Sequence, residues 1–138
     1  MGTFALRLRY PRVPRRLVHD CDLQLPPDPV LLSQLTQLLQ AAGWRVTLWE
    51  QPVPLPLHGS ALVGRYYLRA RRAGAVLDCA YENDDLAWPD FAAGCQWHQG
   101  LPLLRAEVIL QQKAQAARPT DVRFLAWWRQ HIGPLPKT

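Results

Sequence analysis

The clearest periodic pattern in the chain is a helical one between Asp28 and Gly43. Asp28 followed by Pro29 is typical of a helix start, because an aspartate caps the first amides and proline fits the first turn. Apolar residues then recur every three or four positions and would line one face, with glutamine and serine opposite: Leu31, Leu32, Leu35, Leu38, Leu39 and Ala42. Gly43 is the expected end of this helix, whose role is packing.

Shorter stretches carry the pattern of strands. Leu17–Leu25 is an apolar run with Asp20 and Asp22 in its middle, and Trp44–Glu50 alternates from residue to residue. Two further apolar, aromatic-rich runs, 61–71 and 75–81, are joined by Arg72-Ala73-Gly74, a length and composition typical of a hairpin. The proline-rich segment between residues 51 and 60 is expected to be an extended connector.

The two ends of the chain are less uniform. Thr3–Tyr10 fits either a strand or a short helix, and its periodicity does not decide between them. Glu82–Asp85 is expected to be a loop, and residues 88–100 to be irregular apart from a helical turn at 89–93. Helices are predicted for 105–117 and after Thr120 or Asp121, either of which could cap the last one. The predicted strands and helices together lead us to expect an α+β protein, and the length predicts a single domain, 1–138.

Composition narrows the class of protein. At 138 residues with 49% apolar residues, the chain can bury a hydrophobic core without disulfides or structural metal ions. It has no apolar stretch long enough for a membrane span and no charged leader before an apolar segment, so we expect a cytoplasmic protein without a membrane partner. The chain has three cysteines, an odd number, and no C-x-x-C pair: Cys21, Cys79 and Cys95. We therefore expect reduced thiols, with Cys21 and Cys79 in the core.

The net charge of +5 comes almost wholly from arginine. Arginines crowd the stretch before Asp20 and again between Arg65 and Arg72. Two interpretations remain open: a surface that binds a polyanion, or a solvated surface with no such role.

Three aspartates carry the candidate chemistry. On a strand, Asp20 and Asp22 project from the same face, with Cβ atoms roughly 6.5–7 Å apart, close enough to hold divalent cations together. Asp78 lies in a second apolar run, where a buried acid needs a partner. If the two strands are neighbours, the three carboxylates share one face and Cys21 and Cys79 lie on the other. His58 has no second ligand at metal spacing and is expected to be a loop residue.

The order of these motifs resembles the nucleotidyltransferase fold, in particular minimal nucleotidyltransferases and the abortive-infection toxins of toxin–antitoxin systems. The resemblance implies an α+β fold in which helices flank a mixed β-sheet. The resemblance rests on short motifs spread over most of the chain: Gly2-Thr3, Arg15-Arg16, Asp20-Cys21-Asp22, Leu77-Asp78, and Lys113 followed by Arg118 and Asp121. The family's first glycine would precede Gly2, so the resemblance implies a domain shortened at its N-terminus.

The resemblance implies a Mg²⁺-dependent transfer of a nucleotide from a nucleoside triphosphate (NTP) to an RNA or protein acceptor. Asp20, Asp22 and Asp78 would be the catalytic residues and would hold two Mg²⁺ ions. Gly2 and Thr3 would bind the terminal phosphates through backbone amides, with Arg15, Arg16 and Lys113 as countercharges. A toxin-like activity with an antitoxin partner would follow. The alternative is a catalytically inactive domain of the same fold that serves in binding or regulation.

Overall fold

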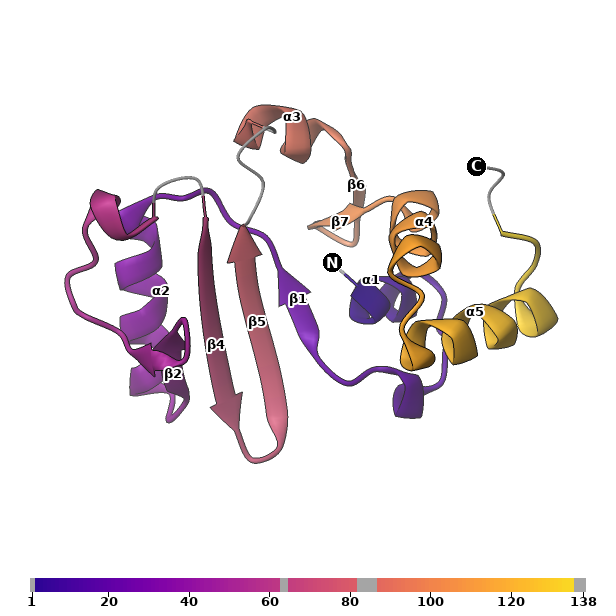
Figure 1. Cartoon of the computed structure of the whole chain (residues 1–138), viewed down its shortest axis with the longest axis horizontal. Coiled ribbons are helices and arrows are strands. Elements are labelled where there is room, and N and C mark those ends of the chain that lie inside the picture. Colours follow the sequence, from indigo (N-terminus) through magenta and orange to yellow (C-terminus); the bar gives the residue numbers. More distant parts are fainter. Residues whose placement is uncertain (1, 63–64, 82–86, 136–138) are drawn as a thin grey trace. The chain divides into compact units, whose positions relative to one another are not determined.

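The computed structural model describes residues 2–62, 65–81 and 87–135. The chain is an α+β protein whose helices accompany a mixed five-stranded sheet and a separate two-stranded sheet (Figure 1). It forms two compact units, one made of Met1–Val18 with Ala92–Thr138 and the other of His19–Phe91. We describe each unit by itself. The prediction of one domain stays a prediction.

The unit 19–91 is built on the five-stranded sheet, in the order β1-β5-β4-β2-β3. Its strands are β1 (Cys21–Leu23), β2 (Arg45–Leu48), β3 (Gln51–Pro52), β4 (Tyr66–Arg72) and β5 (Ala75–Tyr81). β1 is parallel to β5, and the other neighbours are antiparallel. The predicted hairpin and the adjacency of the aspartate strand to residues 75–81 are therefore confirmed.

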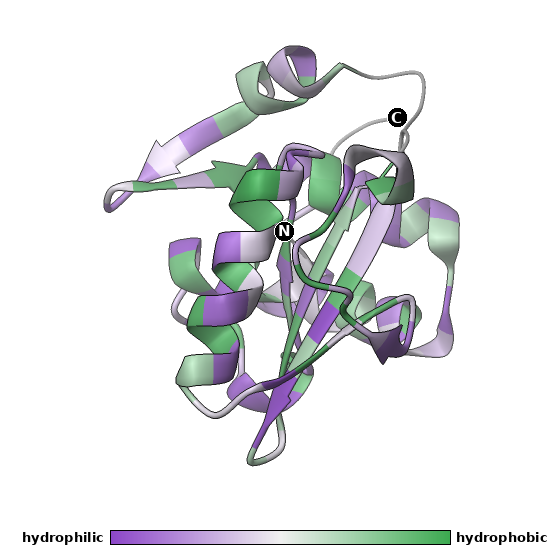
Figure 2. Cartoon of the chain, turned by 90° about the vertical axis from the view of Figure 1, so that its left-hand side faces the viewer, coloured by the Kyte–Doolittle hydropathy of each residue, from purple (hydrophilic) through white to green (hydrophobic). Residues whose placement is uncertain are grey.

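One face of this sheet is the core of the unit. Leu68 and Ala70 of β4, Val46 and Leu48 of β2, and Cys79 of β5 are buried there. Figure 2 shows the alternation behind this burial, since hydrophobic and hydrophilic positions follow one another along β4. The polar face, opposite, carries the intervening residues: Asp20, Asp22, Asp78, Tyr67, Arg69, Arg71, Arg45 and Thr47.

Helix α2 (Pro29–Ala41) covers the core face through Leu32, Leu35 and Leu39. It begins as predicted, because the Asp28 carboxylate accepts from the amides of Val30 and Leu31 at 2.8 and 3.1 Å. Its apolar face is narrower than the sequence indicates, however. Three of the six predicted core residues are exposed: Leu31 by 38%, Leu38 by 70%, and Ala42 after the end of the helix.

Two buried hydroxyls extend the packing face of α2. Ser33 and Thr36 donate to the carbonyls of Pro29 and Leu32, one turn earlier. Ser33 also accepts from the amide of Leu57, which fastens the connector to the helix. Because hydroxyls can satisfy their hydrogen bonds on the helix itself, they occupy core positions that a hydropathy pattern assigns to leucine.

Each of the two hairpins of this unit turns through two residues with positive φ. Ala73 and Gly74 link β4 to β5, and Trp49 and Glu50, with φ of 48° and 65°, link β2 to β3. Such turns match the twist of the strands but favour glycine and asparagine. The short 3-10 helix η2 (Gly59–Leu62) follows β3 and ends the connector.

The other unit is mostly helical. It contains α1 (Gly2–Arg9), the 3-10 helix η1 (Arg15–Leu17), the hairpin of β6 (Cys95–His98) and β7 (Leu101–Leu104), α4 (Ala106–Ala116) and α5 (Pro119–His131). Helix α4 packs against α1 and α5. Tyr10, after α1, meets Trp128 of α5 edge to face at 4.9 Å between ring centroids. Helix α3 (Trp88–Ala93) spans the sequence boundary between the units.

Several predictions for this unit change. Thr3–Tyr10, left open, is a helix, and the turn predicted at 89–93 is confirmed as α3. The irregular assignment for residues 95–100 is wrong, because β6 and β7 pair around Gln99 and Gly100, both with positive φ. The predicted cap of α5 is also wrong: Pro119 opens the helix, Arg118 takes the N-cap position, and Asp121 is buried inside.

Two predictions remain, for the segment after β5 and for the membrane. Glu82–Asp85, expected to be a loop, lies outside the described residues. Within the described ranges, no helix combines the length and apolar character that crossing a membrane requires.

Candidate metal centre

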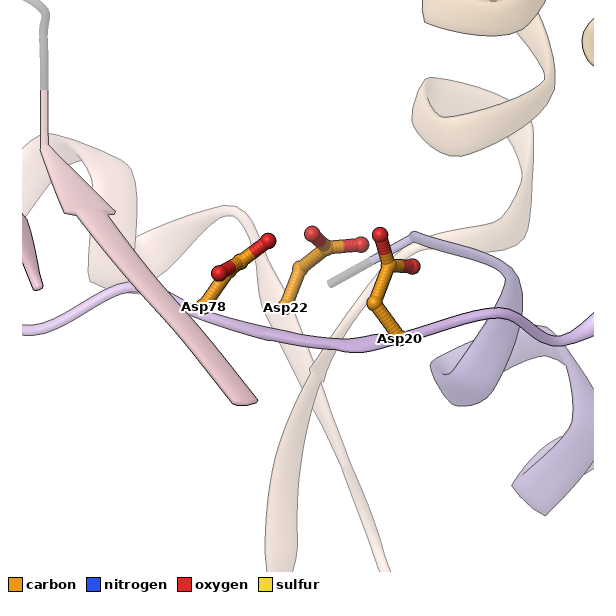
Figure 3. Close-up of side chains that lie close together, drawn as sticks. All are labelled: Asp20, Asp22 and Asp78. Atoms are coloured by element: carbon orange, nitrogen blue, oxygen red, sulfur yellow. The ribbon is translucent and has the colours of Figure 1, made fainter. Parts of the chain in front are cut away.

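The three predicted aspartates meet on the polar face, beside the edge of the five-stranded sheet. Asp22 of β1 pairs in register with Asp78 of β5, and Asp20 stands two residues earlier, just before β1 begins. Figure 3 shows the three carboxylates directed to the same side, and one ligand atom from each lies within 4.8 Å of the others. Asp20 and Asp22 are half-buried, and Asp78 is 7% exposed.

The opposite side of the same strands is partly as predicted. Cys79 is 2% exposed, and burial raises the pKa of its thiol to about 12, so it stays protonated at neutral pH. Cys21 is only half-buried, which corrects the expectation that it lies fully in the core. The reason is its position, because β1 is a three-residue strand at the sheet edge and receives less cover than β5.

Asp78 has the partner that a buried acid needs. Arg69, directly opposite on β4, donates from Nε to Oδ1 at 2.6 Å and from Nη2 to Oδ2 at 2.7 Å. This two-point geometry is the strongest form of an arginine–carboxylate contact. It balances one of the three carboxylate charges and fixes the orientation of Asp78.

Sequence reasoning missed Arg69, although a signal was present. Counting outward from the turn residues Ala73 and Gly74, Arg69 and Asp78 stand at equal distances and must face each other in a two-residue hairpin.

Tyr67 completes the surroundings of the pair. The Arg69 guanidinium lies over its ring, 5.2 Å from the centroid. Burial raises the pKa of the Tyr67 hydroxyl, and the charge of Asp78 raises it further. Tyr67 is therefore neutral at physiological pH and can donate a hydrogen bond toward the carboxylate cluster.

The other predicted site residues belong to the helical unit. Gly2 opens α1 with a φ of 68°, and Thr3 is buried in its first turn. Arg15 and Arg16 are exposed in η1. Lys113 of α4 donates to the Asp121 carboxylate at 2.8 Å, and Arg118 holds the other oxygen of that carboxylate at 2.7 Å.

Comparison with known proteins adds no family. No protein-family model matches the chain, and neither curated proteins nor solved structures give a match. The function therefore has to be argued from the site.

The donor set fits one class of ion. Three carboxylates offer only hard oxygen ligands, which suit Mg²⁺ and Mn²⁺ and do not suit metals that prefer sulfur or imidazole. Both oxygens of Asp78 already accept from Arg69, but each carboxylate oxygen has a second lone pair. Asp20, Asp22 and Asp78 together can therefore ligate a hard divalent cation without breaking the contact with Arg69.

Proposed function

We propose that the protein is a Mg²⁺-dependent nucleotidyltransferase that transfers a nucleotide from an NTP to an RNA or protein acceptor. The observation that supports this most is the meeting of Asp20, Asp22 and Asp78, whose ligand atoms lie within 4.8 Å of one another. Asp22 belongs to β1, Asp20 lies just before that strand, and Asp78 belongs to the parallel neighbour β5, an order that matches the family resemblance of the sequence.

The chain's own residues have separable roles in this proposal. Asp20 and Asp22 hold the cation pair, and Asp78, oriented by Arg69, completes the ligand set on the β5 side. Bound Mg²⁺ supplies neutralisation of phosphate charge and activation of the attacking hydroxyl. The protein supplies positioning, and the buried Arg69–Asp78 contact keeps one ligand fixed before the ion arrives.

The residues proposed to bind the triphosphate are the amides of Gly2 and Thr3 and the cations Arg15, Arg16 and Lys113. The exposure of Arg15 and Arg16 suits contact with phosphate. Lys113 has less freedom, since its ammonium is bound to Asp121 and its side chain is 12% exposed. A toxin-like role, an antitoxin partner and a cytoplasmic location extend the same proposal.

A second candidate is a catalytically inactive domain of this fold that serves in binding or regulation. The observation that favours it is the Arg69–Asp78 contact itself, because a guanidinium can take the place of a cation beside the acids. In that case Asp78 is a structural partner of Arg69, and divalent ions do not bind.

One experiment separates the two. Wild type, Asp22→Asn and Asp90→Asn are incubated with each labelled NTP, Mg²⁺ and total RNA or protein, and label transfer is measured. Asp90 is an exposed acid of α3 and serves as the matched control. We expect transfer by wild type and Asp90→Asn, and a loss of about a hundredfold or more in Asp22→Asn. Absence of transfer by wild type with every NTP and acceptor contradicts the enzyme and leaves the binding domain.

A further inference from the structure

The polar face of the sheet continues beyond the aspartates onto β4 and β2, where Arg45 and Arg71 take no part in the metal site. We define this basic half by its residues Arg45, Arg69, Arg71, Tyr67 and Trp49. Arg45 and Arg71 are exposed and lie directly opposite each other on the antiparallel strands β2 and β4. Within the described part of the chain, neither of them forms an ion pair. Like charges facing each other across strands are unfavourable, and a bound anion would relieve them.

An aromatic pair lies beside Arg69, whose guanidinium is 5.2 Å from the centroid of the Tyr67 ring. The Trp49 ring is 45% exposed and lies 5.9 Å from the Tyr67 ring between centroids. The Trp49 amide donates to the Tyr67 carbonyl at 2.8 Å, so its backbone is anchored to β4. An exposed aromatic beside cations is the combination that binds single-stranded nucleic acid, through base stacking and phosphate pairing.

The backbone at Trp49 is unusual for such a residue. Its φ of 48° places a bulky side chain in the left-handed region, in a turn that favours glycine or asparagine. Such a conformation is unfavourable and is more common where a side chain has a function. Here the turn holds the Trp49 ring beside Tyr67, at one end of the basic half.

The basic half lies on the same face as the acids. Asp22, Asp78, Arg69 and Thr47 form one row across β1, β5, β4 and β2. Adjacent strands are about 4.8 Å apart, so the row extends about 14 Å from Asp22 to β2. The facing negative charges are Asp78, paired with Arg69, and Glu50, whose charge also acts on Arg69. Arg45 and Arg71 stand two residues from this row, on the side opposite to Trp49 and Tyr67.

We infer that the basic half binds the acceptor of the proposed transfer, and that this acceptor is a single-stranded polynucleotide. Its terminal hydroxyl lies at the aspartates, its phosphates at Arg45 and Arg71, and a base against Trp49. A polypeptide acceptor offers neither a row of phosphates nor a series of flat rings, so the face favours a polynucleotide over a protein. The inference rests on the proposed function for the identity of the reaction, whereas the binding itself needs no ion.

Binding is tested first, without NTP and in EDTA, by fluorescence anisotropy with labelled uridine and deoxythymidine oligonucleotides of about ten nucleotides. The double variant Arg45→Gln/Arg71→Gln is expected to bind at least tenfold more weakly and to show a salt slope smaller by about 1.4, because each lost phosphate contact removes about 0.7. Arg72→Gln is the control, since Arg72 is an exposed neighbour on β4 on the other side of the strand. It should change the affinity less than threefold.

Trp49→Asn tests the stacking. We expect roughly tenfold weaker binding, with a melting temperature equal to or above that of wild type, because asparagine tolerates the left-handed conformation. Trp97→Asn, which removes a 76% exposed tryptophan in β6, should bind like wild type. Unchanged affinity in both Trp49→Asn and the arginine double variant overturns the inference.

Transfer assays distinguish this inference from the proposed function. If wild type binds the oligonucleotides through these residues but never transfers label, the proposed function fails and the binding face stands. If label goes to protein, or reaches RNA at an unchanged rate in Arg45→Gln/Arg71→Gln, the function stands and this inference is wrong. The ribose and deoxyribose probes show which sugar the face prefers.

Discussion

Asp121 in α5 and Asp78 in β5 are both buried carboxylates, but their neighbours carry different charges. Asp121, 1% exposed, is one acid held by two cations, Lys113 and Arg118, one at each oxygen. Asp78, 7% exposed, has both oxygens on the single guanidinium of Arg69 and stands beside two further carboxylates. Among the described residues, Asp121 contacts two cations, whereas Asp78 contacts one guanidinium and lies in a group of three acids.

This difference separates a structural ion pair from a site that can take a ligand. A buried carboxylate with matched cations gains nothing from a metal ion, whereas acids gathered on one face gain from any hard cation that enters. Burial alone therefore does not identify a functional acid. The balance of charge around it is the better guide, and it can be tested in five ways.

The largest effect is expected from Asp121→Asn. Breaking a buried pair leaves Lys113 without its carboxylate, so we expect a loss of about 3 kcal/mol in the free energy of unfolding. Urea denaturation measures it, with Glu107→Gln, an exposed acid of α4, as the control. A loss below about 1 kcal/mol would show that the network contributes little.

The same residue predicts a pH dependence. Burial alone raises the pKa of Asp121, but the hydrogen bonds from Lys113 and Arg118 outweigh it and hold the pKa below its usual value. Its contribution is therefore present above the ordinary aspartate range and is lost as pH falls through the lowered pKa. The stability of Asp121→Asn should fall less on acidification than that of wild type. Parallel curves would contradict this.

Arg69→Met should have the next largest effect. It leaves Asp78 in its buried position beside two like charges, so we expect a loss of about 2 kcal/mol without metal. Because the ion then has more repulsion to relieve, Mn²⁺ should raise the melting temperature of Arg69→Met more than that of wild type. An equal or smaller shift in melting temperature would indicate that Asp78 is a structural partner of Arg69 and takes no part in metal binding.

Divalent ions should stabilise wild type by a smaller amount. At ten times the dissociation constant, Mg²⁺ or Mn²⁺ adds about 1.4 kcal/mol by mass action on the folded state. Asp22→Asn should abolish this shift, because it removes one of the three carboxylate ligands. If Asp22→Asn destabilises the metal-free protein by several kcal/mol, Asp22 has a structural role instead.

Arg118→Gln is expected to show the smallest effect. It compares Arg118 with Lys113, the two cations that contact Asp121. The Arg118 side chain is 70% exposed against 12% for Lys113. Water screens the exposed contact, so Arg118→Gln should cost less than about 1 kcal/mol. Lys113→Met should cost more, because that ammonium also lies over the Phe124 ring, 5.2 Å from its centroid. Equal losses in the free energy of unfolding, measured by urea denaturation, would show that solvent exposure does not determine the strength of these two ion pairs.

The sequence correctly predicted those features that depend on residues close together along the chain. The cap at Asp28, the hairpin around Ala73 and Gly74, and the face shared by Asp20 and Asp22 follow from spacing alone. The position of Asp78 beside them required only that one strand lie next to another.

What was missed depends on tertiary partners. Leu38 fits a helical stripe, but the core of the unit reaches only Leu32, Leu35 and Leu39. The β6–β7 hairpin contains Pro102 and turns through Gln99 and Gly100, so its residues lack a clean alternation. Asp121 looks like a cap because aspartate near a helix start usually is one, and only the approach of Lys113 from α4 gives it another role.

The parallel pairing of β1 with β5 has a consequence for folding. Asp22 and Asp78 are partners in register although roughly 55 residues of chain separate them, and closing a loop of that length costs about 3.5 kcal/mol of entropy before any contact forms. The β4–β5 hairpin closes through two residues and can form within microseconds. We therefore expect β1 to add to the open edge of β5 late in folding. On the ribosome, the three carboxylates can meet only after residue 78 has emerged, so a nascent chain cannot capture an ion at this site before its sheet is nearly complete.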